Sequence, residues 1–231
     1  MGVFLIQKYN HMPNPIKPTL KSEIIPLIMI AVSAALSFYF YAHWPMRIAS
    51  HWNFRGEVDG YASSLFMALF FPLLLIGLYL LFLVLPYIDP RREHYVEFAK
   101  TYHVFKGVLL AALLAVYLVT GIYNLGYDFN VGIAVAAIIG VLMIVIGSFL
   151  SKIKFNYFMG IRTPWTLASE TVWDKTHRVG GWLFVLLGCC IIVAPFLPEI
   201  LALIVFITGA AIAVIGSFLY SYLVFRQEKK K

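Results

Sequence analysis

Side chains able to do chemistry gather in one polar stretch that lies between two apolar runs. It reads NYFMGIRTPWTL over residues 156–167 and continues to residue 177. Histidine titrates near neutral pH, so His177 and Glu170 have the chemistry of an acid–base pair. A helix that begins near Ser169 would place both on one stripe. The candidate residues of this 156–177 motif are Asn156, Gly160, Arg162, Thr163, Pro164, Trp165, Thr166, Glu170, Trp173 and His177.

Two roles for the 156–177 motif stay open. In a structural role, Thr163 caps a helix that starts with proline, and Arg162 partners Glu170 or a helix C-terminal carbonyl. Trp165 and Trp173 then anchor the chain at the membrane interface. In a functional role, the motif is a docking surface or pocket for a cytoplasmic partner, formed by Asn156, Arg162, Thr166, Trp173 and His177.

A second polar cluster lies in the connection at 43–63, and its candidate residues are His51, Trp52, Asn53, Gly56, Asp59 and Gly60. Asparagine, aspartate and glycine favour turns. His43, His51, Glu57 and Asp59 are metal-ligand types, but their spacing matches no standard motif, so we predict no metal there. A compact interfacial loop and a recognition surface for something extracellular both remain open.

The elements that must position these clusters are apolar helices. The chain has 231 residues, 61% of them hydrophobic and 13% charged, which excludes a soluble domain of this size. Six runs approach the roughly 20 apolar residues that cross a bilayer, at 24–42, 64–85, 107–123, 131–150, 182–197 and 200–225. The sequence therefore predicts an all-α polytopic membrane protein with six transmembrane helices.

The distribution of charge predicts the topology. All but two of the 18 lysines and arginines fall before span one, between spans two and three, between spans four and five, or after span six. The positive-inside rule then places both termini and the 152–181 connection in the cytoplasm, and 43–63 outside. We expect a multi-pass protein of the plasma membrane. The basic excess is a topology signal, so no nucleic-acid partner is predicted.

An internal repeat organises the second half. Residues 145–150 and 214–219 share the sequence VIGSFL, and a histidine opens both span three and span five, four residues before a glycine. Spans 3–4 and 5–6 are therefore interpreted as a repeated helical hairpin. Small residues with four-residue spacing in span six predict an internal packing face: Gly209, Ala213, Ser217 and Ser221.

The expected units follow from these elements. They are an N-terminal cytoplasmic segment, a two-helix unit with the outward loop, a four-helix unit with the cytoplasmic loop, and a basic tail, at 1–23, 24–88, 89–225 and 226–231. The connection at 89–103 reads as an ordinary charged segment.

Catalysis has little support in the sequence. No recognisable nucleophile setting, HExxH motif or glycine-rich phosphate loop is present, so we predict no catalytic residue, no cofactor and no enzyme. The six span cores carry no charged residue, which disfavours ion transport. The alternative is a membrane transporter or membrane enzyme with a cytoplasm-facing pocket near Arg162, Glu170 and His177.

The 156–177 motif, followed by Gly181, resembles the signature of the SdpI family. His51-Trp52-Asn53 with Gly56 and Asp59-Gly60 resembles the small domain of unknown function that often precedes it. The resemblance covers most of residues 24–225. It implies a membrane immunity protein that protects a cell against a secreted antimicrobial peptide toxin. It also implies signal transduction, in which the toxin-engaged protein holds a cytoplasmic repressor at the membrane.

Overall fold

The computed structural model describes residues 15–53 and 55–230, where six helices are long and apolar enough to cross a membrane. Five are continuous: α2 (Leu20–His43), α3 (Ser64–Ile88), α4 (Ala99–Asn124), α5 (Val131–Leu150) and α6 (Glu170–Val193). The sixth comprises α7 (Glu199–Ala211), a π-helical turn (Ile212–Gly216) and α8 (Ser217–Glu228). The predicted six-helix, mostly helical fold is confirmed. The predicted segment 1–23 lies partly outside the described residues.

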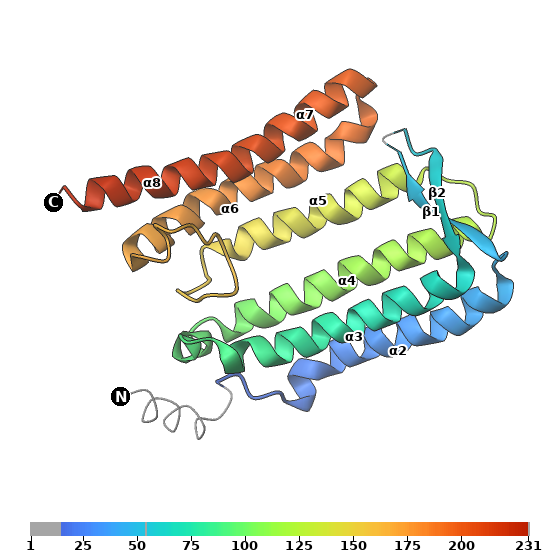
Figure 1. Ribbon diagram of the computed structural model, residues 1–231, viewed down its shortest axis with the longest axis horizontal. Coiled ribbons are helices and arrows are strands. Elements are labelled where there is room, and N and C mark those ends of the chain that lie inside the picture. Colours follow the sequence, from blue (N-terminus) through green and yellow to red (C-terminus); the bar gives the residue numbers. More distant parts are fainter. Residues whose placement is uncertain (1–14, 54, 231) are drawn as a thin grey trace.

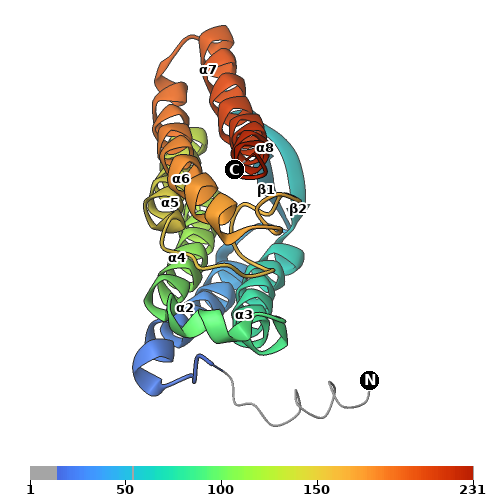
Figure 2. The same ribbon diagram turned by 90° about the vertical axis from the view of Figure 1, so that its left-hand side faces the viewer.

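The helices lie side by side in one elongated bundle (Figure 1). Helices α2, α3 and α4 pack together, α5 lies between α4 and α6, and α7–α8 returns along α6. The start of α2, the segments 89–98 and 151–169 and the end of α8 lie at one end of the bundle, and the turned view agrees (Figure 2). Both ends of the described chain lie at this end, as expected for a chain that crosses the membrane six times. The assignment of this end to the cytoplasm stays a prediction from the distribution of charge.

The 43–63 connection forms a two-stranded β-hairpin within this mostly helical fold. Strand β1 (Arg47–Trp52) pairs antiparallel with β2 (Val58–Ser63), and the register shifts at His51. In β1, Ile48 and Ala49 are both buried against the helices and His51 is exposed, whereas β2 alternates between half-buried and exposed residues. Alternating burial of this kind is typical of a strand that covers a core on one face. The hairpin lies at the opposite end of the bundle from segments 89–98 and 151–169 (Figure 1).

Several helices extend beyond the predicted apolar runs. Helix α4 begins at Ala99, eight residues before the predicted apolar run at 107. Helix α6 begins at Glu170, twelve residues before the apolar run at 182 but where the sequence predicts a helix starting near Ser169. Helix α8 continues to Glu228, so the predicted basic tail from 226 is helical at its beginning. The additional turns of α4 and α6 have both buried and exposed residues, whereas the added residues of α8 are all exposed. Charged residues therefore lie within helices that the hydropathy pattern shortened.

Glycines bring α5 and α6 into direct backbone contact. A Cβ placed on Gly147 would lie 2.5 Å from the Gly181 carbonyl oxygen, and one on Gly188 would lie 2.5 Å from the Gly140 carbonyl oxygen. Both helices carry these glycines seven residues apart, which is two turns, so the contacts repeat along the antiparallel pair. Small residues at such helix crossings permit the close packing that holds membrane helices together, where the hydrophobic effect does not drive helices to associate. The predicted packing face of the sixth span is also confirmed, since all four of its residues are buried: Gly209, Ala213, Ser217 and Ser221.

Candidate functional site

The 156–177 motif divides into a buried half and an exposed half. Its segment between α5 and α6 folds back over the end of the bundle before α6 begins (Figure 1). Buried members are Asn156, Thr163, Thr166, Trp173 and His177, whereas Gly160, Arg162, Pro164 and Glu170 are exposed and Trp165 is half-buried. One continuous docking surface composed of all ten residues therefore does not exist in this fold.

Asn156 organises the segment through its side-chain amide, which is completely buried. Its Oδ1 accepts hydrogen bonds from the backbone N–H groups of Phe158 (2.9 Å) and Met159 (2.6 Å). Its Nδ2 donates to the carbonyl oxygens of Lys154 (2.8 Å) and Met159 (3.1 Å). Two donors and two acceptor positions are the full capacity of an amide. Asn156 thus has no hydrogen-bonding group left for a partner.

His177 is fixed in one neutral tautomer by its two backbone contacts. Nδ1 lies 2.8 Å from the Trp173 carbonyl oxygen, which can only accept, and Nε2 accepts from the Ile161 N–H at 2.9 Å. Both ring nitrogens are therefore occupied, and the ring is completely buried. Gly160 lies against Nε2 with φ +106°, so a side chain there would collide with the imidazole. His177 acts here as a structural bridge between the segment and α6.

Trp173 lies in the core, so the prediction that it anchors at the membrane interface is wrong. It is completely buried, stacks on His177 with ring centroids 4.0 Å apart, and packs edge-on against Phe155. Its Nε1 donates to the Ile153 carbonyl oxygen at 2.8 Å. Trp165 packs instead against Phe218 of α8. The two tryptophans thus brace the motif against different helices.

Thr163 attaches the motif to α8, and Thr166 holds the segment together internally. Thr163 Oγ1 lies 2.9 Å from Ser221 Oγ, and Thr166 Oγ1 donates to the Ile161 carbonyl oxygen at 2.8 Å. Thr163 Oγ1 also accepts from the Thr166 N–H, as a helix cap does. The predicted helix after Thr163 is nevertheless only a single turn, because the regular helix begins after Ser169, whose Oγ accepts from the Val172 N–H. The predicted start of α6 is confirmed.

Arg162 and Glu170 do not form the predicted pair. Arg162 Nη1 donates to the Tyr157 carbonyl oxygen at 2.9 Å. Glu170 Oε1 lies 3.6 Å from Nη1 of Arg91, which belongs to another connection. Because His177 is also enclosed, the three residues of the alternative catalytic or transport pocket have three separate sets of partners.

The connection after α3, predicted to be an ordinary charged segment, is part of the same polar assembly. Asp89 is buried, and its Oδ2 accepts from the Tyr95 hydroxyl and from the Tyr157 N–H, both at 3.0 Å. Burial, together with the nearby Asp89 carboxylate, raises the pKa of Tyr95 well above its usual range. The Arg91 guanidinium lies 3.8 Å above the centre of the Phe155 ring. Segment 89–98 therefore supports the 156–177 motif directly.

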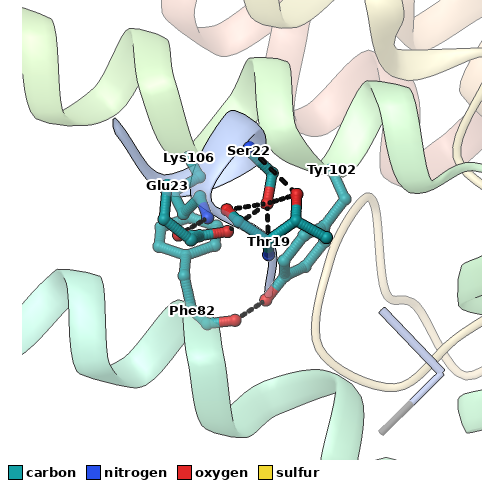
Figure 3. Close-up of polar contacts among 6 residues, drawn as sticks. All are labelled: Thr19, Ser22, Glu23, Phe82, Tyr102 and Lys106. Atoms are coloured by element: carbon teal, nitrogen blue, oxygen red, sulfur yellow. Dashed lines mark hydrogen bonds and ion pairs between the residues drawn. The ribbon is translucent and has the colours of Figure 1, made fainter. Parts of the chain in front are cut away.

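Sequence reasoning also missed a buried ion pair between α2 and α4. Lys106 Nζ lies 2.5 Å from Glu23 Oε2, and the two side chains are 2% and 7% exposed. Ser22 Oγ donates to the other carboxylate oxygen at 2.8 Å (Figure 3). Both residues lay outside the predicted apolar runs. The signal that could have found Lys106 was helical spacing. His103 and Lys106 are three residues apart, as on one face of a helix, which indicates that the helix of span three begins before residue 107.

The predicted outward residues gather in the β-hairpin. His51 Nδ1 lies 2.5 Å from Asp59 Oδ1 across the strands, and both side chains are exposed. Asn53 Oδ1 accepts from the N–H groups of Arg55 and Glu57, which forms the predicted turn. Gly60 has no room for a side chain, because a Cβ there would lie 2.8 Å from the Cβ of His51.

The remaining members of the hairpin cluster fix its position. Gly56 adopts φ +79° beside Asn130, a conformation that favours glycine. Trp52 packs edge-on against Tyr123 of α4, and Arg55 forms an exposed ion pair with Glu199 at the start of α7. In the described part of the chain, no three histidine, cysteine, aspartate or glutamate side chains are grouped to hold a metal ion.

The outer faces of these helices are apolar. Large apolar side chains are exposed along the bundle, including Phe38, Leu73 and Ile204, as expected for surfaces solvated by lipid. Six such helices joined by polar end segments define a multi-pass helical membrane protein.

Comparisons with known proteins agree with this class. Residues 152–221 match the SdpI/YfhL protein family, and residues 28–76 match a domain of unknown function, DUF1648. The Immunity protein SdpI of Bacillus subtilis (strain 168) is 26% identical over 203 residues, which are 88% of this chain and 95% of that protein. No solved structure matches the chain. The family resemblance stated from the sequence is thereby confirmed for both loops.

Proposed function

We propose that this chain is a membrane immunity protein, which protects the cell that makes it against a secreted antimicrobial peptide. The observation that carries the proposal is the similarity to Immunity protein SdpI along nearly the whole of both chains. Such a match includes both polar clusters and the helices that hold them. The proposed location is the plasma membrane, with both termini inside.

The geometry supports a binding role more than a catalytic one. A catalytic centre requires its groups to converge on one reacting position. Arg162, Glu170 and His177 instead contact the Tyr157 carbonyl oxygen, Arg91 and two backbone groups respectively. The exposed strand residues of the hairpin, by contrast, have side chains accessible to a peptide outside the cell.

We propose the hairpin as the toxin-facing surface. Tyr61 is 60% exposed and lies opposite the buried strand residue Ala49, and Met46 just before β1 is 85% exposed. Exposed aromatic and methionine side chains on a rigid strand pair are typical of recognition surfaces. The His51–Asp59 contact adds polar groups on the exposed part of the hairpin.

Signal transmission is proposed for the opposite end, where a cytoplasmic repressor would dock. The exposed side chains of the motif are the ones available for that contact: Arg162, Pro164 and Glu170. The buried members hold this surface in place. Docking and bracing are thus assigned to different residues of one motif.

Expression in a strain that lacks Immunity protein SdpI tests the proposal. We expect the chain to protect such cells against the peptides that the intact strain secretes. Tyr61→Ala together with Met46→Ala should abolish protection while the protein still accumulates in the membrane. The matched control is Leu65→Ala with Leu69→Ala, which removes exposed apolar groups from α3 outside the hairpin. Equal survival of cells with and without the chain would refute the immunity proposal.

A second comparison separates docking from bracing. Trp173→Ala removes a completely buried ring and should lower the amount of protein in the membrane, since such truncations cost about 3–5 kcal/mol. Arg162→Ala should leave the amount unchanged and reduce transcription controlled by the repressor. If Arg162→Ala leaves that transcription intact, the docking assignment is wrong, whatever the survival assay gives.

A further inference from the structure

A groove between α6 and α8 is lined by cationic and polar side chains to which the proposed function assigns no role. It encloses about 390 Å³ near the ends of these helices, on the side of the bundle where the 156–177 motif lies. Lys175 and Arg178 of α6 line it, together with Tyr220 and Gln227 of α8. All four side chains carry hydrogen-bond donors, and two of them are cationic.

The two cations are not neutralised within the described residues. Neither Lys175 nor Arg178 makes a hydrogen bond or ion pair there, and no acidic residue lines the groove. Their three-residue spacing puts them on one face of α6, about 4.5 Å apart along its axis. The groove therefore presents an uncompensated double positive charge.

The rest of the lining is apolar and lies on the same two helices. Val179, Leu223 and Val224 supply it. Arg178 lies about 12 Å along α6 from its first residue, where the helix passes from polar surroundings into its apolar run. A site with cations near a helix end and aliphatic side chains beside them offers contacts to both the phosphate and the apolar part of a phospholipid.

We propose that this groove binds one anionic phospholipid of the inner leaflet. The Arg178 guanidinium has the forked geometry that binds two phosphate oxygens, and Lys175 adds a second positive charge. Gln227, near the end of α8, donates to the headgroup, and Tyr220, two turns deeper along α8, donates to an ester oxygen. The apolar part of the lipid lies against Val179, Leu223 and Val224. Basic pockets between helices on the cytoplasmic side suit such headgroups. The inference does not depend on the immunity proposal.

Binding to the purified full-length protein in a neutral detergent tests the site. The probes are dioctanoyl phosphatidylglycerol, dioctanoyl phosphatidylcholine and inorganic phosphate, measured by thermophoresis. We expect saturable binding of phosphatidylglycerol, at least about tenfold tighter than phosphatidylcholine. Lys175→Gln with Arg178→Gln should weaken binding about 25-fold, since each cation near an anionic headgroup contributes about fivefold.

The matched control is Arg226→Gln with Lys229→Gln. It removes the same two charge types from the exposed end of α8, outside the groove lining. An equal loss in both double variants would show diffuse attraction and overturn the site. Full displacement of the lipid by millimolar inorganic phosphate would overturn the lipid assignment and indicate a free-phosphate site. Phosphatidylcholine binding as tightly as phosphatidylglycerol would overturn the role of charge.

Discussion

Removing one partner of the Glu23–Lys106 ion pair should destabilise the protein strongly. The pair joins α2 to α4, with Nζ and Oε2 2.5 Å apart and both side chains under a tenth exposed. Lys106→Met keeps the length of the side chain but leaves a buried carboxylate without its cation. An uncompensated buried charge of this kind costs about 3–5 kcal/mol. For a chain of this size that corresponds to a fall in Tm of about 6–20 °C.

Replacing both partners should recover most of that loss. Glu23→Leu combined with Lys106→Met removes both desolvated charges, and apolar replacements of buried pairs are often neutral or stabilising. We therefore expect the double variant to have a Tm within a few degrees of the parent protein. Thermal unfolding in detergent, followed by tryptophan fluorescence, measures all the variants under one condition.

An exposed ion pair in the same chain provides the control. Arg55 and Glu199 join the hairpin to α7, but their side chains are 62% and 57% exposed. Arg55→Met should cost at most about 1 kcal/mol, because water solvates the remaining carboxylate. The reasoning is refuted if Arg55→Met and Lys106→Met lower the Tm equally. It is also refuted if the double replacement is no more stable than Lys106→Met alone.

Three further substitutions test the packing and the polar loop. Gly147→Val should separate α5 from α6 and reduce the amount of folded protein on size-exclusion chromatography, whereas Gly77→Val, with no atom within 4 Å of the added Cβ, should not. Asn156→Asp should lower the Tm by several degrees, because it removes two donors and sets a carboxylate against two carbonyl oxygens, each costing about 1–3 kcal/mol; an unchanged Tm would contradict the assigned bonds. Gly160→Ala should be more destabilising than Gly126→Ala in the same melting experiment, since both have positive φ but only the first meets a buried ring. Equal effects would mean that backbone conformation alone accounts for the loss.

The spans could be predicted because lipid imposes a simple requirement. Every backbone group in the apolar layer must be bonded within the chain, so long apolar runs become helices whatever their neighbours are. The start of α6 at Ser169 could be predicted for a local reason too, since a serine hydroxyl caps the helix three residues on. These features depend on residues close together in sequence.

Features that depend on distant residues escaped prediction. Asp89 looks like a solvated turn residue, yet it is buried by Tyr95 and by the backbone of Tyr157, 68 positions away. Lys106 was excluded from span three because hydropathy treats a lysine as a boundary, whereas the fold supplies Glu23 from another helix. The hairpin was missed because its strands are short and contain Gly60 and His51 at a register shift. In each case the partner, rather than the residue itself, determines the structure.

The unusual chemistry of the 156–177 motif has a physical reason that needs no reaction. The chain must leave α5 and enter α6 through a segment that is partly buried against the end of the bundle. An irregular segment there leaves backbone N–H and carbonyl groups that cost free energy unless they are bonded. Asn156 and His177 bond six such contacts between them. Residues of catalytic type are therefore explained here by backbone satisfaction.

That explanation leaves the exposed residues as the informative ones for function. Arg162 and Glu170 are polar, lie on the surface, and make contacts through only part of their hydrogen-bonding capacity. A guanidinium carries five N–H donors, and Arg162 uses one nitrogen in this fold. Residues that are held by a rigid segment and still have unused donors meet the requirement for recognising a partner without rearrangement. The buried half of the motif thus pre-organises the exposed half, and substitutions in the two halves must have different phenotypes.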